Sequence, residues 1–215
     1  MLDAVRYAAS MARGRFFVIE GADGVGSTTQ VIRLVEALRL DGRTVHQTAE
    51  PSQGPVGKLI RQMLGGDRPR QQIHRELALL FGADRLDHVA REIEPALAAG
   101  TDVVSDRYTL SSLVYQSLDL PLDWVRELNR FAPPADATVL IHVPLEEAWR
   151  RLEARLDAGS PREVFDHKTT QARVHGEYER QAKRHGAIIV DGTGTPDEVG
   201  ARVRSALQAT GLWPR

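Results

Sequence analysis

At 215 residues, the chain is long enough for one sizeable buried core, and a single α/β domain over residues 15–215 is the ordinary outcome. Its hydrophobic fraction of 42% and charged fraction of 27% are typical of soluble globular proteins, which excludes a membrane-spanning class. A net charge of −1 gives no overall attraction to nucleic acid, so we predict neither a nucleic-acid nor a membrane partner. The chain has no cysteine, which excludes disulfides and thiolate metal sites and favours a cytoplasmic location.

Residues 1–14 lack the long apolar core of a secretory signal, and we predict that they form an extension outside the folded core. After them, strand and helix patterns alternate. The apolar runs that predict strands are "RFFVIEG", "RTVHQTAEP", "TDVVSDRY", "ATVLIHV" and "AIIVDGTG". Helical spacing follows in "STTQVIRLVEALRLDG", "PVGKLIRQML" and "RELALLFGADRLDHVAREIEPALAAG". Strands without polar alternation, joined by helices, predict a five-stranded parallel sheet with helices on both faces.

A glycine-rich loop, "GADGVGSTT" at residues 21–29, follows the first strand and opens a helix. It matches the phosphate-loop pattern G-x-x-x-x-G-K-[ST] except that Ser27 stands at the lysine position. Backbone N–H groups and the helix N-terminus bind anions without lysine, and the hydroxyl at the Thr28 position commonly ligates Mg²⁺. The alternative is that Ser27 merely caps a helix in a loop that no longer binds nucleotide. The predicted ATP phosphate-binding residues are Gly21, Gly24, Val25, Gly26, Ser27, Thr28 and Thr29.

Several segments together resemble the thymidylate kinase family: "FFVIEGADGVGSTTQ", "AEPSQGPVGKLIRQML", "LLFGADRLDHV", "VVSDRYTLSSLVYQ" and "IIVDGTGTPDEV". They occur in the family's order and cover residues 15 to about 207. The resemblance implies a P-loop NTPase fold and a homodimeric nucleoside monophosphate kinase. Such an enzyme transfers the γ-phosphoryl group of ATP to dTMP, giving dTDP and ADP with Mg²⁺, as a step of dTTP synthesis.

The resemblance also assigns roles at the acceptor end of the site. Phe81 matches the aromatic residue that stacks on thymine, and Arg85 the arginine that hydrogen-bonds the base edge. The two lie one helical turn apart, so they point the same way. The alternative for Phe81 is a core position beside Leu77 and Leu80. The further positions that we predict to bind dTMP are Glu50, Arg61, Arg107, Ser112, Tyr115 and Gln116.

Three charged residues are assigned to the reacting groups. Asp23 resembles the loop carboxylate near the acceptor, with a turn aspartate as the alternative. Arg107 matches the arginine beside the acceptor phosphate, and Asp106, with Thr28, the metal-binding position. Asp106 and Arg107 are alternatively a structural ion pair, but they lie at the carboxyl end of a central strand, where such sheets bind ligands.

Two cations that the family often carries are absent: the loop lysine, replaced by Ser27, and the arginine of "T-R-E-P", replaced by Ala49. Losing one such phosphate contact typically costs about 10²–10³ in rate unless another group replaces it. For Ala49 we expect partial replacement by Arg61.

For Ser27 we expect replacement from a lid at about residues 151–168, where Arg155 and Arg162 are preferred over Arg151 as catalytic residues. The alternative for these arginines is a solvated helix face with neighbouring acids.

The sequence thus favours an active or weakly active thymidylate kinase. One alternative is a nucleotide-binding protein without useful catalysis, such as a dimeric regulator. The other is a kinase for another pyrimidine monophosphate such as dUMP, since discrimination of one methyl group in an apolar pocket is worth only about 1–3 kcal/mol.

Overall fold

The computed structural model describes residues 13–213, and its centre is one parallel sheet. The strands are β1 (Phe16–Glu20), β2 (Val45–Ala49), β3 (Asp102–Asp106), β4 (Ala137–His142) and β5 (Ile188–Asp191). Their order across the sheet is β2-β3-β1-β4-β5. All five predicted strands are present, and the predicted parallel pairing is confirmed. The first strand lies in the middle, which explains why every residue of it is buried.

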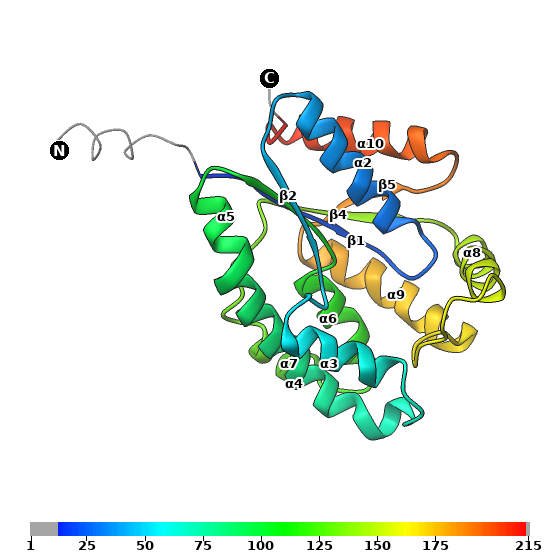
Figure 1. Ribbon diagram of the computed structural model, residues 1–215. Helices are drawn as coiled ribbons and strands as arrows, with labels where there is room; N and C mark the ends of the chain where they lie inside the picture. The colour runs from blue at the N-terminus through cyan, green and yellow to red at the C-terminus, as the bar shows by residue number, and fades with distance from the viewer. Residues whose placement is uncertain (1–12, 214–215) are drawn as a thin grey trace, which may run out of the picture.

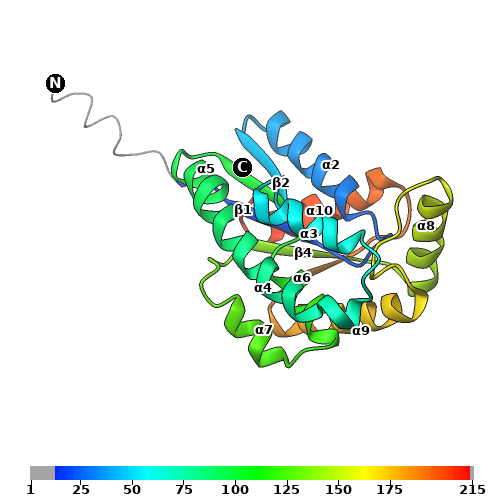
Figure 2. The same ribbon diagram turned by 60° about the horizontal axis from the view of Figure 1, so that its bottom comes forward.

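Helices cover both faces of the sheet, as Figures 1 and 2 show. One face carries α2 (Ser27–Leu40) and α10 (Pro196–Ala209), which pack on each other. The opposite side carries α4 (Arg70–His88), α5 (Glu94–Ala98), α6 (Thr109–Tyr115), α7 (Leu122–Leu128) and α9 (Lys168–Arg184), with α3 (Pro55–Leu64) against α4. A π-helical turn, η1 (Val89–Ile93), joins α4 to α5, and a 3₁₀ turn, η2 (Gln116–Leu118), follows α6. The remaining helix, α8 (Leu145–Asp157), lies at the end of the sheet near the glycine-rich loop.

The central strand divides its side chains between two apolar clusters. Phe17 and Ile19 belong to the cluster that includes α2 and α10, whereas Phe16 and Val18 pack with residues of η1 and α5. Successive side chains of a strand point to opposite faces, so an uninterrupted apolar run is buried only when both faces are covered. This burial is the physical reason for the absence of polar alternation in "FFVI".

Two predicted segments differ in detail. The long helix after "PVGKLIRQML" begins at Arg70 rather than Arg75, passes through the π-helical turn η1 and ends at Ala98, two residues before Gly100, whose φ is +77°. The predicted lid is partly regular, because residues 151–157 continue α8 and only residues 158–167 are irregular before α9 begins.

Residues 1–12 of the predicted extension lie outside the described residues. The extension's last residue, Gly14, donates its backbone N–H to the carbonyl of Leu97 (2.9 Å), so it contacts the core.

The carboxyl ends of β1, β2 and β3 meet at one edge of the sheet and bring Glu20, Glu50 and Asp106 into one region. This edge is the expected ligand-binding edge of a doubly wound sheet. Within residues 13–213, no helix combines the length and apolar character needed to cross a membrane.

Candidate active site

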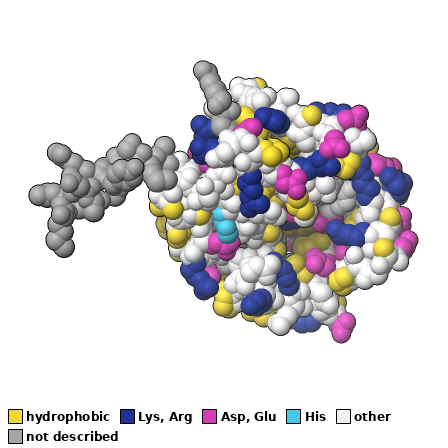
Figure 3. All heavy atoms as spheres, turned by 45° about the horizontal axis from the view of Figure 1, so that its top comes forward, with side chains coloured by type: hydrophobic (Ala, Val, Ile, Leu, Met, Phe, Trp, Pro, Cys, Tyr) yellow, Lys and Arg dark blue, Asp and Glu magenta, His cyan; other side chains and the backbone are white. Residues whose placement is uncertain are grey.

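A cavity of about 870 Å³ opens at this edge of the sheet. The molecular surface is hollowed there, with hydrophobic side chains inside and charged side chains of both signs around the opening (Figure 3). The predicted site residues that line the cavity are Asp23, Gly24, Gly26, Ser27, Thr28, Thr29, Glu50, Arg61, Phe81, Arg85, Arg107, Ser112, Tyr115, Gln116 and Arg155. Four predicted residues are not in its lining: Gly21, Val25, Asp106 and Arg162.

The glycine-rich loop turns sharply into α2. Gly24 and Gly26 have φ angles of +86° and +92°, a region that side-chain-bearing residues rarely adopt. A Cβ on Gly24 would also lie 2.2 Å from the carbonyl oxygen of Ala148 on α8, so the loop approaches that helix closely. Val25 lies outside the lining because its side chain is buried in the apolar core. The loop therefore presents backbone and short hydroxyl side chains to the cavity at the N-terminus of α2.

Thr28 and Asp106 form a set of oxygen atoms suited to a hard cation. The Thr28 hydroxyl donates to Oδ2 of Asp106 (2.5 Å), and Oδ1 of Asp106 is buried without a hydrogen-bond partner among residues 13–213. Hydroxyl and carboxylate oxygens are the ligands that Mg²⁺ prefers, and it usually takes only one or two from the protein beside phosphate oxygens and water. The described residues contain no group of three or more His, Cys, Asp or Glu side chains arranged so that they could hold a metal ion by themselves. These two residues thus fit a metal that is shared with a bound phosphate.

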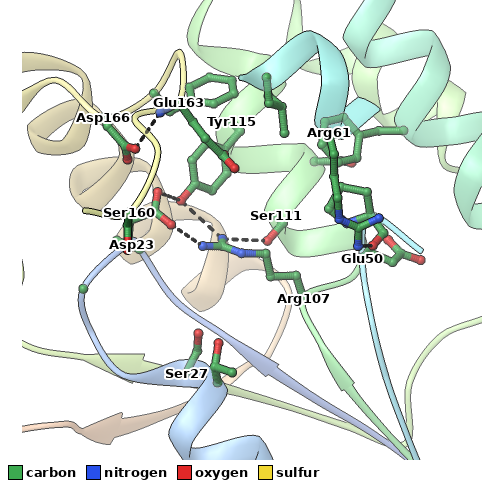
Figure 4. A pocket seen from close by; sticks show the side chains of 18 of the residues that line it. Asp23, Ser27, Glu50, Arg61, Arg107, Ser111, Tyr115, Ser160, Glu163 and Asp166 are labelled. Atoms are coloured by element: carbon green, nitrogen blue, oxygen red, sulfur yellow. Dashed lines mark hydrogen bonds and ion pairs between the residues drawn. The ribbon is translucent and has the colours of Figure 1, made fainter. Parts of the chain in front are cut away.

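Arg107 joins the glycine-rich loop to α6 across the cavity (Figure 4). Its Nη2 donates to Asp23 (2.7 Å), and its Nη1 donates to the hydroxyls of Tyr115 (3.2 Å) and Tyr178 (3.1 Å). Tyr115 also donates to Asp23 (2.9 Å). Burial lowers the pKa of Arg107, but its interactions with Tyr115 and Asp23 outweigh that effect and raise the pKa above its ordinary value. The guanidinium is a permanent cation at the centre of the cavity.

The backbone of Arg107 is strained, with a φ of +73°. Glu20, at the end of β1, lies behind it and accepts hydrogen bonds from the backbone of Tyr108 (2.8 Å) and from the hydroxyls of Ser111 (2.6 Å) and Tyr178 (3.0 Å). Burial raises the pKa of Glu20, although its hydrogen bond with Ser111 opposes the shift. Glu20 thus holds α6 and α9 in the positions from which Ser111 and Tyr178 contact Arg107.

Arg85 is buried in an ion pair with Glu50 at the other end of the cavity. Its Nε and Nη2 donate to one carboxylate oxygen of Glu50 (2.9 and 2.6 Å), and the side chain is only 1% exposed. The remaining N–H groups donate to the carbonyl of Tyr108 (3.0 Å), to Ser112 (3.1 Å) and to Asn129. All five N–H groups of the fork therefore have protein partners. The sequence predicted an arginine facing a ligand, and it did not anticipate this enclosure.

The remaining acceptor-side residues come from α4, α6 and η2. Phe81 is half-buried, since it both lines the cavity and packs against the main apolar cluster, so each of its two predicted settings is partly met. Ser112 and Gln116 are buried and line the same cavity. Arg61 also lines it, and its guanidinium donates to the carbonyls of Pro51 and Ser52 (2.6 Å to Ser52), beside Glu50 in Figure 4.

The three arginines of the predicted lid differ in position. Arg151 lines the cavity and donates to the carbonyl of Val25 in the glycine-rich loop (3.4 Å), and its Nε donates to Glu147 (2.7 Å). Arg155 is exposed and lines the cavity. Arg162 is exposed and is not in the lining, although it donates to the carbonyl of Asp166 (2.9 Å). Arg151, rather than Arg162, therefore lies in the cavity lining, because α8 continues through residues 151–157 and carries Arg151 past the loop.

Several residues of the site were not singled out in the sequence. Glu163 and Asp166 line the cavity, and burial raises the pKa of both carboxyl groups. Gln171 and Tyr178 on α9 contact Asp23 (2.8 Å) and Arg107 (3.1 Å), respectively. Both lie in a helical pattern with no motif around them. A signal was available only for Glu163 and Asp166, which lie within the predicted lid.

Comparisons with known proteins agree with this geometry. A family model described as thymidylate kinase matches residues 19–203. A probable thymidylate kinase of Thermococcus gammatolerans is 44% identical over 149 residues, covering 66% of this chain and 72% of the relative. Probable thymidylate kinases of Methanococcus vannielii and Methanococcus maripaludis are each 36% identical, over 195 and 203 residues. Those two alignments cover 86% and 90% of this chain, and 91% and 94% of the relatives.

Proposed function

Because the chain belongs to the thymidylate kinase family, and so phosphorylates dTMP with ATP, we propose that the cavity holds both substrates around Arg107. ATP lies at the glycine-rich loop, and dTMP lies toward Phe81 and Arg85. The observation that carries this proposal is that Arg107 contacts Asp23 in the loop (2.7 Å) and Tyr115 on α6 (3.2 Å). A fixed cation between donor and acceptor stabilises the charge that moves during phosphoryl transfer.

The acceptor base stacks on Phe81, a contact worth about 1–3 kcal/mol in other nucleic-acid sites. Arg85 meets the base edge, with Ser112 and Gln116 at its side. Since every N–H of Arg85 already has a protein partner, a thymine carbonyl shares or replaces the contact with Ser112 or Asn129. Glu50 keeps the guanidinium in place during that exchange.

The acceptor phosphate lies between Arg61 and Arg107, whose planar forks suit phosphate oxygens. Arg61 takes part of the role of the arginine missing at Ala49, because both flank the end of β2. Asp23 lies beside the deoxyribose and the transferred group, where it also orients Arg107.

Thr28 and Asp106 would hold Mg²⁺, and the ion would neutralise charge on the β- and γ-phosphates. The unpartnered, buried Oδ1 of Asp106 supports this assignment. The N–H groups of the glycine-rich loop and the N-terminus of α2 bind the remaining phosphate charge.

The charge that Ser27 does not supply comes from α8. Arg151 lies against the loop carbonyl of Val25, and Arg155 is exposed in the same lining. We therefore place Arg151 first and Arg155 second among the arginines that contact the donor phosphates.

Two alternatives remain testable, and neither the family nor the names of the relatives favours them. They are a nucleotide-binding regulator without catalysis and a kinase of another pyrimidine such as dUMP. The deciding experiment supplies ATP–Mg²⁺ with dTMP, dUMP, dCMP and dGMP separately and resolves ADP and the nucleoside diphosphates by chromatography. Selective dTDP formation is the expected result. Absence of any diphosphate, while ATP still raises the melting temperature, would instead establish the regulator.

A homodimer belongs to the same proposal, supported by exposed leucines on the outer side of α3 and α4: Leu59, Leu79 and Leu86. A cytoplasmic location also stays a prediction, and cell fractionation tests it.

A further inference from the structure

A chain of polar side chains leads from Arg85, in the part of the cavity where we place the acceptor base (the base pocket), toward the protein surface. At its inner end, Oε2 of Glu50 accepts both hydrogen bonds from Arg85, while Oε1 lies 3.3 Å from Nδ1 of His88. The exposed fractions of the Arg85, Glu50 and His88 side chains are 1%, 3% and 0%. A carboxylate only accepts hydrogen bonds, so in its contact with Glu50 the Nδ1 atom of His88 must carry the hydrogen.

The outer half of the chain begins at the other nitrogen of the same ring. Nε2 of His88 lies 2.7 Å from the hydroxyl of Thr48 on β2 and 3.6 Å from Oε2 of Glu92 on η1. Glu92 in turn lies 2.7 Å from Nε2 of His46, and both of these side chains are about one third exposed, at 37% and 36%. With Nδ1 carrying the hydrogen, Nε2 of a neutral ring accepts from Thr48. Both ring nitrogens are therefore satisfied.

This arrangement fixes the plane of the Glu50 carboxylate. A carboxylate bound only through Oε2 is free to rotate about its last side-chain bond, since that torsion is broad. The second hydrogen bond at Oε1 removes this freedom, and Oε2 then faces Nε and Nη2 of Arg85. His88 is absent from the cavity lining, so its effect on a ligand passes through Glu50 and Arg85.

We propose that His88 is a positioning residue for the acceptor nucleotide: with Thr48 at its outer nitrogen, it orients the Glu50 carboxylate that holds Arg85 at the base pocket. This inference rests on the proposed placement of dTMP. It assigns a specific task to a buried imidazole that touches no substrate. Because ATP lies at the opposite end of the cavity, the effect is confined to the acceptor.

Substitutions at His88 test the proposal, because a positioning role predicts weaker dTMP binding with an almost unchanged kcat. In His88→Leu, the hydrogen bond to a charged, buried carboxylate is lost, and we expect KM and Kd for dTMP to rise about tenfold or more. The kcat and the KM for ATP stay within about twofold. His88→Asn places an amide N–H near the former Nδ1, and we expect it to keep KM for dTMP within about threefold of the wild type.

Two further variants keep the test independent of a general folding defect. Thr48→Val removes the hydroxyl from Nε2 with little change in shape, and a smaller rise in KM for dTMP is expected. His142→Leu is the control, because His142 also pairs with a glutamate, Glu179 (3.0 Å), but at an exposed position outside the cavity lining. It should leave both KM values unchanged. If His88→Leu does not fold, Thr48→Val and His88→Asn still decide the matter.

Three results would overturn the proposal: unchanged dTMP affinity in His88→Leu, an equal loss for ATP and dTMP, or no difference between the Asn and Leu variants. Failure of the proposed function is distinguishable, since wild-type protein would then form no dTDP. Calorimetric Kd values for dTMP would still measure the effect of His88.

Discussion

Ser27 leaves the glycine-rich loop without the ammonium group of the common motif, and the proposed replacement, Arg151, lines the same cavity. Arg151 donates to the loop carbonyl of Val25 (3.4 Å) and is held from behind by Glu147 (2.7 Å). Arg150 binds the same carboxylate (2.8 Å) but is absent from the cavity lining. The two adjacent arginines thus share Glu147, but of the two only Arg151 lines the cavity and contacts Val25.

Replacing Arg151 with alanine is expected to lower kcat by about 10²-fold, because one fixed donor to the transferring phosphate is lost. Steady-state production of ADP with saturating dTMP measures this. Arg150→Ala is the matched control and should remain within about twofold.

A second substitution, in the glycine-rich loop, tests whether Arg151 replaces the missing lysine at Ser27. Ser27→Lys restores the common motif, so it should recover most of the activity of Arg151→Ala while changing the wild type little. Equal rates for the two single arginine variants, or no recovery in the double variant, would remove Arg151 from the donor site.

The carboxylate that orients these arginines should stay ionised in mild acid. Hydrogen bonds from Arg150 and Arg151 lower the pKa of Glu147 from 4.5 to about 2. A depressed pKa means that the stabilising pairing is present above pH 4.5 and is lost only as pH falls toward 2. Carbon NMR of Glu147 should therefore show an ionised carboxylate at pH 4. A midpoint near 4.5 is expected only for the Arg150→Ala, Arg151→Ala double variant.

At the scale of elements, the loop between β1 and α2 is pressed against α8. The contact runs through backbone, because a Cβ on Gly24 would lie 2.2 Å from the carbonyl oxygen of Ala148. Gly26 has a similar φ (+92° against +86°), yet a Cβ there meets nothing within 4 Å. Substitutions at these two glycines therefore distinguish the cost of backbone strain, which both share, from the cost of a collision with α8, which only Gly24 has.

Gly26→Ala should lower the free energy of unfolding by about 1–2 kcal/mol, the cost of a left-handed backbone with a Cβ. Gly24→Ala bears the same cost plus the collision with α8, so it should be less stable and should also weaken ATP binding. Urea unfolding and calorimetry with ATP measure the two effects. Similar stabilities would show that α8 moves away freely.

At the scale of the whole molecule, the charges nearly cancel at a net −1, so anionic substrates depend on the local arginines rather than on a long-range field. Among the exposed large hydrophobic side chains of the described residues, three lie on α3 and α4. Leu59, Leu79 and Leu86 are 43%, 52% and 43% exposed on the adjacent helices α3 and α4. These helices also carry Arg61 and Arg85, so a dimer through this surface would support the acceptor half of the site.

Light scattering after size exclusion should give about twice the mass of one chain for the wild type. Leu79→Glu places a charge within the apolar surface and should produce monomers. Leu40→Glu is the control, since Leu40 is 88% exposed at the end of α2, far along the chain from this surface. A monomeric wild type, or dimers in Leu79→Glu, would exclude this interface.

Local sequence patterns were sufficient to predict the parallel sheet and the glycine-rich loop. The apolar runs predicted all five strands, because a strand covered on both faces requires apolar residues at consecutive positions. The glycine spacing predicted a phosphate loop, since the turn into α2 needs positive φ angles at Gly24 and Gly26. The placement of Asp23, Arg107 and Tyr115 in one cavity followed from their positions after parallel strands.

Tertiary packing decided which side chains meet, because sequence spacing records the element but not its neighbours. The sequence favoured Arg162 over Arg151 within one basic segment, and only the course of α8 shows that Arg151 is the arginine beside the loop. Arg85 is enclosed by Glu50 and Asn129, which lie 35 and 44 positions away from it in the sequence. His88 lies within the quoted segment "LLFGADRLDHV" but received no predicted role, and its contact with Glu50 exists only because α4 packs beside the end of β2. Such long-range contacts depend on how the helices pack against the sheet, and local sequence periodicity does not specify that packing.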